Sequence, residues 1–277
     1  MPQKIGYLGP AGTFTETAAI QYNPEGTLVP FSSIPLVAES VRAGETDEGI
    51  IPIENSLEGA VTTTLDLLIQ EKTLFIRHEL AIPIEHCLLT SPSWSENSIK
   101  LIYSHPQALG QCREFLERRF PEAQVIATLS TVTAVEEMKK SKIPSAAIAP
   151  QRAAELYQVK ILETGVQDFP NNVTRFVVLS ANEHPPTGND KTSICFGFDT
   201  NRAGLLYGVM GDFASRRISL TKVESRPTKE SLGRYIFLVD LEGHKDDPTV
   251  KDALMAVAKR TSGLKIFGSY PVFYETE

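Results

Sequence analysis

A polar segment divides the chain into two stretches of different pattern, and this division constrains the fold more than any other feature. Residues 182–191 combine two prolines and a glycine with polar side chains, and apolar runs flank them on both sides. Such a composition is typical of a linker between domains. A chain of 277 residues is long enough for about two domains. We therefore predict one domain over residues 1–181 and a second over residues 192–277, joined by the linker.

In the first part, short apolar runs alternate with helical patterns. Strands are predicted over residues 4–8, 48–53, 80–89, 100–102, 146–149 and 175–179. Because helix candidates separate these runs, we expect an α/β domain with a largely parallel or mixed sheet.

Two helix starts in this part carry the capping pattern in which Glu or Gln follows Ser or Thr by three residues. Thr13 precedes Glu16, and Ser104 precedes Gln107, with a proline tolerated in the first turn. Unpaired N–H groups at helix N-termini attract anions. Both starts are therefore candidate anion sites.

The second part has a simpler order. Strands are predicted over residues 192–198, 218–225, 234–241 and 265–273, with helical stripes over residues 205–213 and 250–258. The resulting order is β-α-β-β-α-β, which indicates a ferredoxin-like module.

Charge and cysteine content narrow the function. The chain has a net charge of −7, and residues 1–181 carry all of it, with 14 basic and 21 acidic side chains. This balance disfavours general binding to nucleic acid or to an anionic membrane, although a small anionic ligand held by local donors stays possible. Three widely spaced cysteines suit a reducing cytoplasm. The five histidines show no metal-ligand spacing, and no apolar stretch is long enough to span a membrane.

Three further segments hold clustered polar groups. Residues 9–14 join the first strand to the first helix but lack both nucleotide-loop patterns, so a tight turn is the simpler interpretation. Residues 54–56 follow an apolar strand at the end where open α/β sheets bind ligands, and a loop with a helix cap explains them equally well. Residues 171–176 offer two amides, a hydroxyl and a guanidinium to a carboxylate, against the alternative of a solvated strand start.

Two side chains near these segments invite a catalytic interpretation that we do not favour. Ser104 and His105 lie close in sequence to Cys112, but adjacent residues rarely face each other and no third orienting group is visible. We therefore interpret Ser104 and His105 as a helix start.

Thr174 and Arg175 are neighbours on a predicted strand and should point to opposite faces, so one of them is expected to lie outside a shared cleft.

Taken together, these segments resemble the prephenate dehydratase family followed by an ACT regulatory domain. The resemblance extends over essentially the whole chain in order, and its motifs are residues 9–15, 52–56, 104–108, 130–131 and 171–176, then 220–227 and 268–271. It implies a two-lobed, periplasmic-binding-protein-like catalytic domain, with one lobe of residues 1 to about 78 with 160–181 and another of residues 79–159. It also implies decarboxylating dehydration of prephenate to phenylpyruvate without a cofactor, since aromatisation of the ring drives the reaction.

The resemblance assigns roles to individual residues. It marks Thr174 as catalytic, and it implies substrate contacts by Thr13, Glu54, Asn55, Ser56, Ser104, His105, Gln107, Thr131, Arg175 and Phe176. In the ACT module it implies an L-phenylalanine effector site at Ala203, Gly204, Leu205, Leu206, Ser219, Leu220, Glu224 and Ser225. The sequence departs from the family at Ala203, where proline is common, and at Ser219, where asparagine is usual, so the strength of regulation stays open.

The resemblance leaves three alternatives to settle. Arogenate dehydratase differs only in an amine on the substrate, and no residue separates it from prephenate dehydratase. A small-molecule sensor without catalysis is a further alternative, because both folds occur in sensors. The assembly is expected to be a homodimer or a homotetramer.

Overall fold

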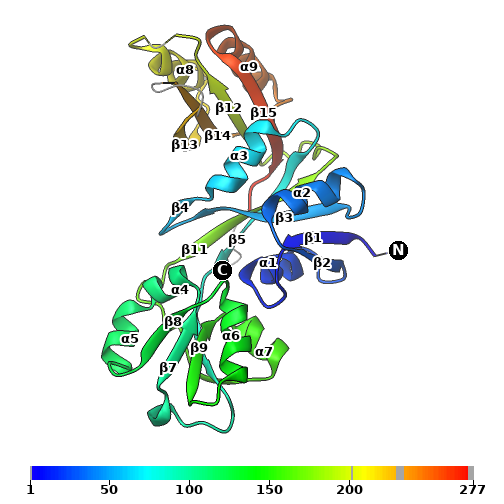
Figure 1. The fold of residues 1–277 in the computed structure, drawn as a ribbon. Helices are drawn as coiled ribbons and strands as arrows, with labels where there is room; N and C mark the ends of the chain where they lie inside the picture. The colour runs from blue at the N-terminus through cyan, green and yellow to red at the C-terminus, as the bar shows by residue number, and fades with distance from the viewer. Residues whose placement is uncertain (1, 201, 229–233, 274–277) are drawn as a thin grey trace. The chain divides into compact units, whose positions relative to one another are not determined.

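The computed structural model describes residues 2–200, 202–228 and 234–273, so the last four residues of the predicted second domain lie outside the described part. The chain forms two compact units. Figure 1 shows the helices and strands that compose them. Unit 1 consists of Met1–Val37, Ile50–Val61 and Ala81–Phe176, and unit 2 of Ala38–Gly49, Thr62–Leu80 and Val177–Glu277. In the described part of the chain, no helix has the length and apolar character that crossing a membrane requires.

The first sheet has the strand order β2-β1-β3-β11-β5, and β4 pairs with β3. These strands are β1 (Lys4–Leu8), β2 (Thr27–Phe31), β3 (Glu48–Asn55), β4 (Gly59–Ala60), β5 (Phe75–Pro83) and β11 (Val173–Ser180). The associated helices are α1 (Phe14–Tyr22), α2 (Ile34–Arg42) and α3 (Thr62–Gln70). Strand β1 runs parallel to β2, as α/β topology requires when a helix connects neighbouring strands.

The second sheet has the order β10-β6-β9-β7-β8 and lies between two pairs of helices (Figure 1). Its strands are β6 (Cys87–Thr90), β7 (Leu101–Ser104), β8 (Gln124–Ala127), β9 (Ser145–Ala149) and β10 (Lys160–Thr164). The helices are α4 (Pro106–Gln111), α5 (Arg113–Arg119), α6 (Thr131–Lys140) and α7 (Gln151–Tyr157), with a short 3-10 turn η1 (Glu96–Ser98) before β7.

Alternation along the strands of this sheet separates two cores. On β6, Cys87 and Leu89 pack with α6 and α7, whereas Leu88 packs with α4 and α5. Successive side chains on a strand point to opposite faces, so a fully apolar strand is buried on both sides.

The predicted α/β class is confirmed, but some boundaries are wrong. The single strand predicted over residues 80–89 is two strands, because Pro83 has no N–H to continue the ladder and the chain leaves the first sheet there. Strand β10 pairs with β6, so residues 160–164 belong to the second sheet and not to the first lobe as predicted. The prediction missed β2, β8 and β10, which are edge strands with more exposed, less apolar sequences.

The predicted β-α-β-β-α-β order in unit 2 is confirmed. Its elements are β12 (Asp190–Gly197), α8 (Leu205–Ala214), β13 (Leu220–Pro227), β14 (Tyr235–Glu242), α9 (Pro248–Arg260) and β15 (Ser262–Pro271). The antiparallel sheet has the order β13-β14-β12-β15. Apolar residues of both helices pack on one face of it, including Val209, Phe213, Val250 and Leu254.

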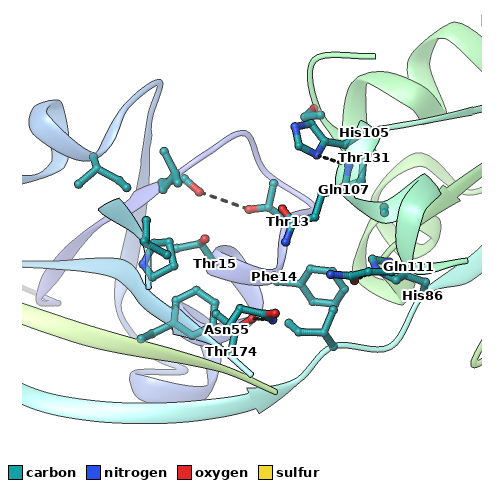
Figure 2. A pocket seen from close by; sticks show the side chains of 18 of the residues that line it. Thr13, Phe14, Thr15, Asn55, His86, His105, Gln107, Gln111, Thr131 and Thr174 are labelled. Carbon is teal, nitrogen blue, oxygen red and sulfur yellow. Dashed lines mark hydrogen bonds between the residues drawn. The ribbon is translucent and has the colours of Figure 1, made fainter. Parts of the chain in front are cut away.

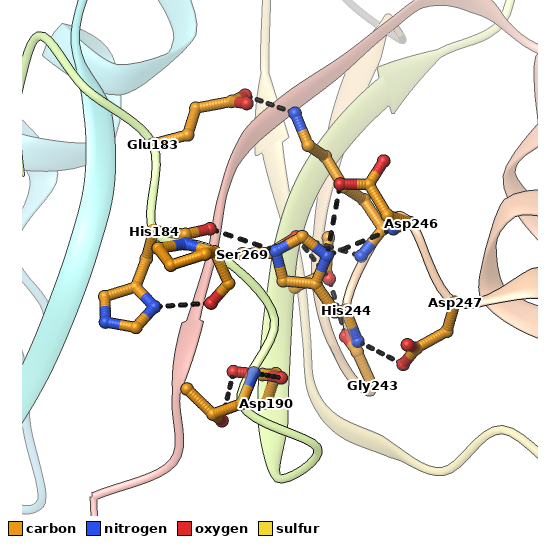
Figure 3. A network of polar contacts seen from close by, with 12 residues as sticks. Glu183, His184, Asp190, Gly243, His244, Asp246, Asp247 and Ser269 are labelled. Atoms are coloured by element: carbon orange, nitrogen blue, oxygen red, sulfur yellow. Dashed lines mark hydrogen bonds and ion pairs between the residues drawn. The ribbon is translucent and has the colours of Figure 1, made fainter.

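Polar contacts hold the predicted linker (Figure 3). The buried imidazole of His244 contacts the backbone carbonyl of His184 at 3.1 Å, and the Glu183 carboxylate pairs with Lys245. Asp190 accepts hydrogen bonds from Thr187 and Gly188, which lower the pKa of its carboxyl against the effect of burial. Strand β12 begins at this aspartate, so the linker ends slightly earlier than predicted.

Candidate functional site

A cavity of about 390 Å³ in unit 1 lies between residues of the first and second sheets. Its walls are Leu8, Thr13, Phe14, Thr15, Ile34, Pro52, Asn55, Val61, Ile84, His86, His105, Gln107, Ala108, Gln111, Leu129, Ser130, Thr131, Thr174 and Phe176. Figure 2 shows the labelled side chains from both sides of this space. A cavity of this size accommodates a small molecule.

The N-terminus of α1 forms part of one wall. Thr13 caps the helix by accepting the Glu16 N–H, as its sequence pattern predicted. Glu16, however, does not reach back to Thr13: its carboxylate accepts the Gly12 N–H at 2.8 Å and pairs with Arg152 at 3.0 Å. Gly12 has a φ of +91°, which a residue with a Cβ rarely adopts. Glu16 therefore holds the loop before the helix and leaves the first turn facing the cavity.

A second helix N-terminus faces the same cavity. Ser130 caps α6 by accepting the Thr133 N–H at 2.9 Å, and Thr131 begins the helix. The first N–H groups of a helix have no intrahelical acceptor and carry partial positive charge. Two such ends at one cavity provide sites for anionic groups such as carboxylates.

The third wall carries a buried network of amides. The Asn55 amide nitrogen donates to the Asn172 side-chain oxygen at 2.7 Å and to the Thr174 hydroxyl at 2.9 Å. Asn172 in turn donates to the Gln111 side-chain oxygen, and His86 Nε2 lies 3.0 Å from that same oxygen. Figure 2 shows Asn55 beside Thr174, and Gln111 beside His86. Thr174 is thus held by Asn55, and Asn55 is linked through Asn172 to Gln111 and His86.

Thr174 and Arg175 point in different directions, as strand alternation predicted. Thr174 lines the cavity, whereas Arg175 does not and lies 3.7 Å from the Glu54 carboxylate. Glu54 is also absent from the cavity wall. The negative charge of Glu54 is therefore paired with a cation away from the cavity.

Ser104 does not cap α4, and this prediction was wrong. Its hydroxyl is fully buried and donates to the Ile148 carbonyl at 2.7 Å. The cap is His105, whose Nδ1 accepts the Gln107 N–H at 3.3 Å. The reason is register: strand β7 extends through Ser104, so that side chain belongs to the sheet. His105 and Gln107 line the cavity, whereas Ser104 does not.

Most of the remaining predicted substrate residues line the cavity, whereas Ser56 lies outside its wall. Phe176, Asn55, Thr13 and Thr131 line the cavity. Ser56 does not, but its hydroxyl accepts the Val173 N–H at 2.9 Å and so joins the loop after β3 to the start of β11.

The sequence did not identify His86. It is only 3% exposed, lines the cavity and contacts the Phe14 ring edge to face at 5.5 Å. Burial lowers the pKa of its imidazole, so His86 is neutral near pH 7. The available signal was one polar residue directly before the fully buried strand β6, which is a weak signal because such residues commonly begin strands.

The cavity wall is electrically neutral. Among the residues that the structure describes, no Lys, Arg, Asp or Glu side chain lines the cavity. The described residues also contain no cluster of His, Cys, Asp and Glu that would hold a metal ion. Burial raises the pKa of the Cys112 thiol to about 12, with Asp168 adding to the effect, so Cys112 is not a thiolate nucleophile.

The predicted effector residues lie at two places in unit 2. Ala203 and Gly204 precede α8, where Gly204 has a φ of +87° and caps the helix, and Leu205 and Leu206 form its first turn. Ser219 directly precedes β13, which contains Leu220, Glu224 and Ser225. Glu224 pairs with Lys222 at 3.3 Å.

Comparison with known proteins agrees with this architecture. The family model for prephenate dehydratase matches residues 5–184, and the ACT domain model matches residues 200–259. A bifunctional chorismate mutase/prephenate dehydratase from Pseudomonas aeruginosa is 39% identical over 98% of this chain and 73% of its own length. A prephenate dehydratase from Methanocaldococcus jannaschii is 36% identical over 99% of this chain and 100% of its own.

Solved structures share the fold. The prephenate dehydratase from Arthrobacter aurescens in complex with L-Phe has a TM-score of 0.89 at 36% identity, covering 97% of this chain and 90% of its own. GqqA, described as a novel type of quorum quenching acylase, has a TM-score of 0.88 at 29% identity, covering 98% of each chain. With a family match over most of its length and relatives above 30% identity, the chain belongs to the prephenate dehydratase family and carries a C-terminal ACT domain.

Proposed function

We propose that the cavity of unit 1 converts prephenate to phenylpyruvate, carbon dioxide and water. The bond between the ring and its carboxylate breaks, and that electron pair completes the aromatic ring as the ring C–O bond breaks. The departing hydroxide takes up one proton and leaves as water. The enzyme must therefore hold two carboxylates and stabilise negative charge at the leaving oxygen.

One observation carries the proposal: the Thr174 hydroxyl lines the cavity and already accepts a hydrogen bond from Asn55 at 2.9 Å. In the described part of the chain, no acceptor for the hydroxyl hydrogen of Thr174 is found. An unactivated alcohol is a poor acid, but it is an effective donor to an oxygen that gains negative charge. We infer that Thr174 donates this hydrogen bond to the leaving hydroxyl.

The neutral wall supports recognition of carboxylates by hydrogen bonds. Thr13 and Thr131 cap or begin two of the helices whose N-termini line the cavity, and Gln107 lines it near the start of a third helix, α4. Helix N-termini attract carboxylates without a side-chain cation. The two ends supply one site for each of the substrate's carboxylates.

The same wall favours prephenate over arogenate. Arogenate carries an ammonium group, which is costly to bury unless a carboxylate or several acceptors pair with it. Among the described residues at the cavity no acidic side chain is present, and Glu54 pairs with Arg175 instead. We propose that prephenate is the preferred substrate.

The test compares Thr174→Val with Thr174→Ser, which retains the hydroxyl, using the absorbance of phenylpyruvate. We expect kcat of the valine variant to fall about 10²–10³-fold with KM little changed, and the serine variant to keep most of its activity. An unaffected kcat in Thr174→Val would refute the role of Thr174. A wild-type kcat/KM higher for arogenate than for prephenate would refute the assigned substrate.

We further propose that L-phenylalanine binds the ACT domain and inhibits the enzyme. The relative from Arthrobacter aurescens was solved with L-Phe, and the residues that the family resemblance assigns to the effector lie in the turn at Ala203 and Gly204, the start of α8 and the edge strand β13. The exposed edge of β13 suits pairing with a second copy, as a homodimer or homotetramer requires. Titration with L-phenylalanine, followed by activity and by light scattering, tests both proposals.

The described thiols support a reducing location. Cys87, Cys112 and Cys195 are all buried and free, which is the usual state in the cytoplasm. We therefore propose a cytoplasmic enzyme.

The cavity does not favour the acylase activity of GqqA. Acyl transfer needs a nucleophile next to a general base. The described side-chain hydrogen bonds of the two cavity histidines are with the Gln111 side chain and with the Gln107 backbone, and neither is with a serine or threonine hydroxyl.

A further inference from the structure

The amide network behind Thr174 has a direction that backbone groups impose. The Asn55 side-chain oxygen accepts the N–H groups of Leu57 and Glu58, both at 3.0 Å. Backbone N–H groups donate and never accept, so this oxygen cannot be exchanged with the amide nitrogen. The Asn55 nitrogen must therefore point the other way, toward Asn172 and Thr174.

This donor-to-acceptor direction passes through Asn172 and ends at the Gln111 side-chain oxygen. Because Asn55 donates to the Asn172 oxygen, the Asn172 nitrogen is left to donate to the Gln111 oxygen at 3.0 Å. That oxygen also faces His86 Nε2 at 3.0 Å, and two acceptors do not form a hydrogen bond. His86 Nε2 must therefore carry a hydrogen.

These contacts determine the tautomer of His86. Burial lowers the pKa of this imidazole, so it holds one hydrogen near pH 7, and Nδ1 is left as a lone pair. Nδ1 is buried, and among the described residues it has no hydrogen-bond partner. A hydrogen on Nδ1 would thus be unsatisfied, which further favours the Nε2–H form.

We propose that Asn55, Asn172, Gln111 and His86 form one polarised hydrogen-bond chain that presents the Thr174 hydroxyl hydrogen to the cavity, with His86 as the positioning residue that ends it. The proposal rests on the proposed function for the role of Thr174. His86 does not reach the reacting atoms in this scheme. It orients Gln111, which orients Asn172, which keeps the Asn55 amide in place against Thr174.

The first test is ¹⁵N NMR of the full-length protein labelled at its histidines. The His86 signals are identified by their loss in His86→Gln. We expect the shift of Nε2 to be that of a protonated nitrogen and the shift of Nδ1 that of a bare one in the wild type. A His86 protonated at Nδ1, or at both nitrogens at pH 7, would overturn the polarity of the chain.

The second test compares two variants at His86 by kinetics. His86→Gln keeps a nitrogen donor for Gln111, whereas His86→Leu fills similar space without one. We expect kcat to fall about tenfold in the leucine variant with KM within about threefold, and kcat to stay within about threefold in the glutamine variant. A leucine variant with wild-type kcat, or a glutamine variant equally impaired, would overturn the positioning role.

The two tests separate this inference from the proposed function. The tautomer of His86 is read without any substrate, so it reports on the chain even if prephenate proves not to be consumed. A wild type that does not convert prephenate refutes the proposed function, and His86 protonated at Nδ1 refutes the inference.

Discussion

Replacing Asn55 by aspartate should reverse the direction of the hydrogen bonds in the chain. Thr174 would then no longer donate a hydrogen bond into the cavity, while the protein stays folded. The carboxylate keeps an oxygen for the N–H groups of Leu57 and Glu58, both at 3.0 Å. Its second oxygen takes the place of the nitrogen that now donates to Asn172 at 2.7 Å and to Thr174 at 2.9 Å. The Thr174 hydroxyl would then turn and donate to Asp at position 55, and its hydrogen would no longer face the cavity.

The magnitudes follow from these contacts. Two donated hydrogen bonds are lost, at about 1 kcal/mol each, but Thr174 and a turned Asn172 amide can both donate to the carboxylate instead. Charge-assisted hydrogen bonds of this kind offset much of the cost of burying the charge. We therefore expect the free energy of unfolding to change by less than about 2 kcal/mol. The loss of one donor to a developing oxyanion should lower kcat about 10²–10³-fold.

The assay combines phenylpyruvate formation with urea unfolding and ¹⁵N NMR of His86. Asn171→Asp is the matched control, because it makes the same chemical change at an exposed neighbouring position. We expect His86 to move to the Nδ1–H form in Asn55→Asp only, since a turned Gln111 would donate to Nε2. The reasoning fails if kcat of Asn55→Asp stays within threefold of the wild type, or if Asn171→Asp loses as much activity.

Three further predictions concern stability and reactivity. Lys265→Met should lower the free energy of unfolding by about 1–3 kcal/mol in urea, because Lys265 Nζ donates to the carbonyls of Leu68, Ile69 and Glu71 at the end of α3; exposed Lys251→Met is the control and should change little. Burial, His184 and Arg77 lower the pKa of His78 to about 4, so protonation favours the unfolded chain; the free energy of unfolding should fall as pH drops from about 6.5 to about 4, and His78→Gln should flatten that slope. Cys112, with its pKa raised to about 12, should react with iodoacetamide at pH 8 only after denaturation, and rapid labelling of the native protein would contradict its burial.

Local sequence patterns predicted much of the fold because helices, strands and turns depend on interactions between residues that are close in sequence. The strand Lys4–Leu8 and the β-α-β-β-α-β order were both readable, since alternation, helical periodicity and turn residues act over short distances. The errors occurred at strands and strand ends whose positions are determined by pairing with distant parts of the chain. Edge strands such as β10 lack a strong apolar signal, and β5 ends at Pro83 for want of an N–H.

The start of α4 is a second case in which tertiary pairing overrode a local sequence pattern. The sequence from Ser104 matches a capping pattern, but the register of β7 against β9 buries Ser104 and passes the cap to His105. The sequence correctly predicted a capped helix start near residue 105, but the position of β7 in the sheet determines that His105 and not Ser104 is the cap.

The motifs by themselves determined the family resemblance, the catalytic candidate Thr174 and the absence of Arg175 from its face, because motif order and strand alternation are properties of the chain. Only the tertiary structure brought Asn55, Gln111, Asn172 and His86 into one directed chain, since the Asn55 to Thr174 contact spans 119 residues. The proposed function gives the acidic charge balance of residues 1–181 a physical meaning. Under that proposal an anion binds in a neutral cavity because hydroxyls, amides and helix N-termini converge there, and convergence is a property of the fold alone.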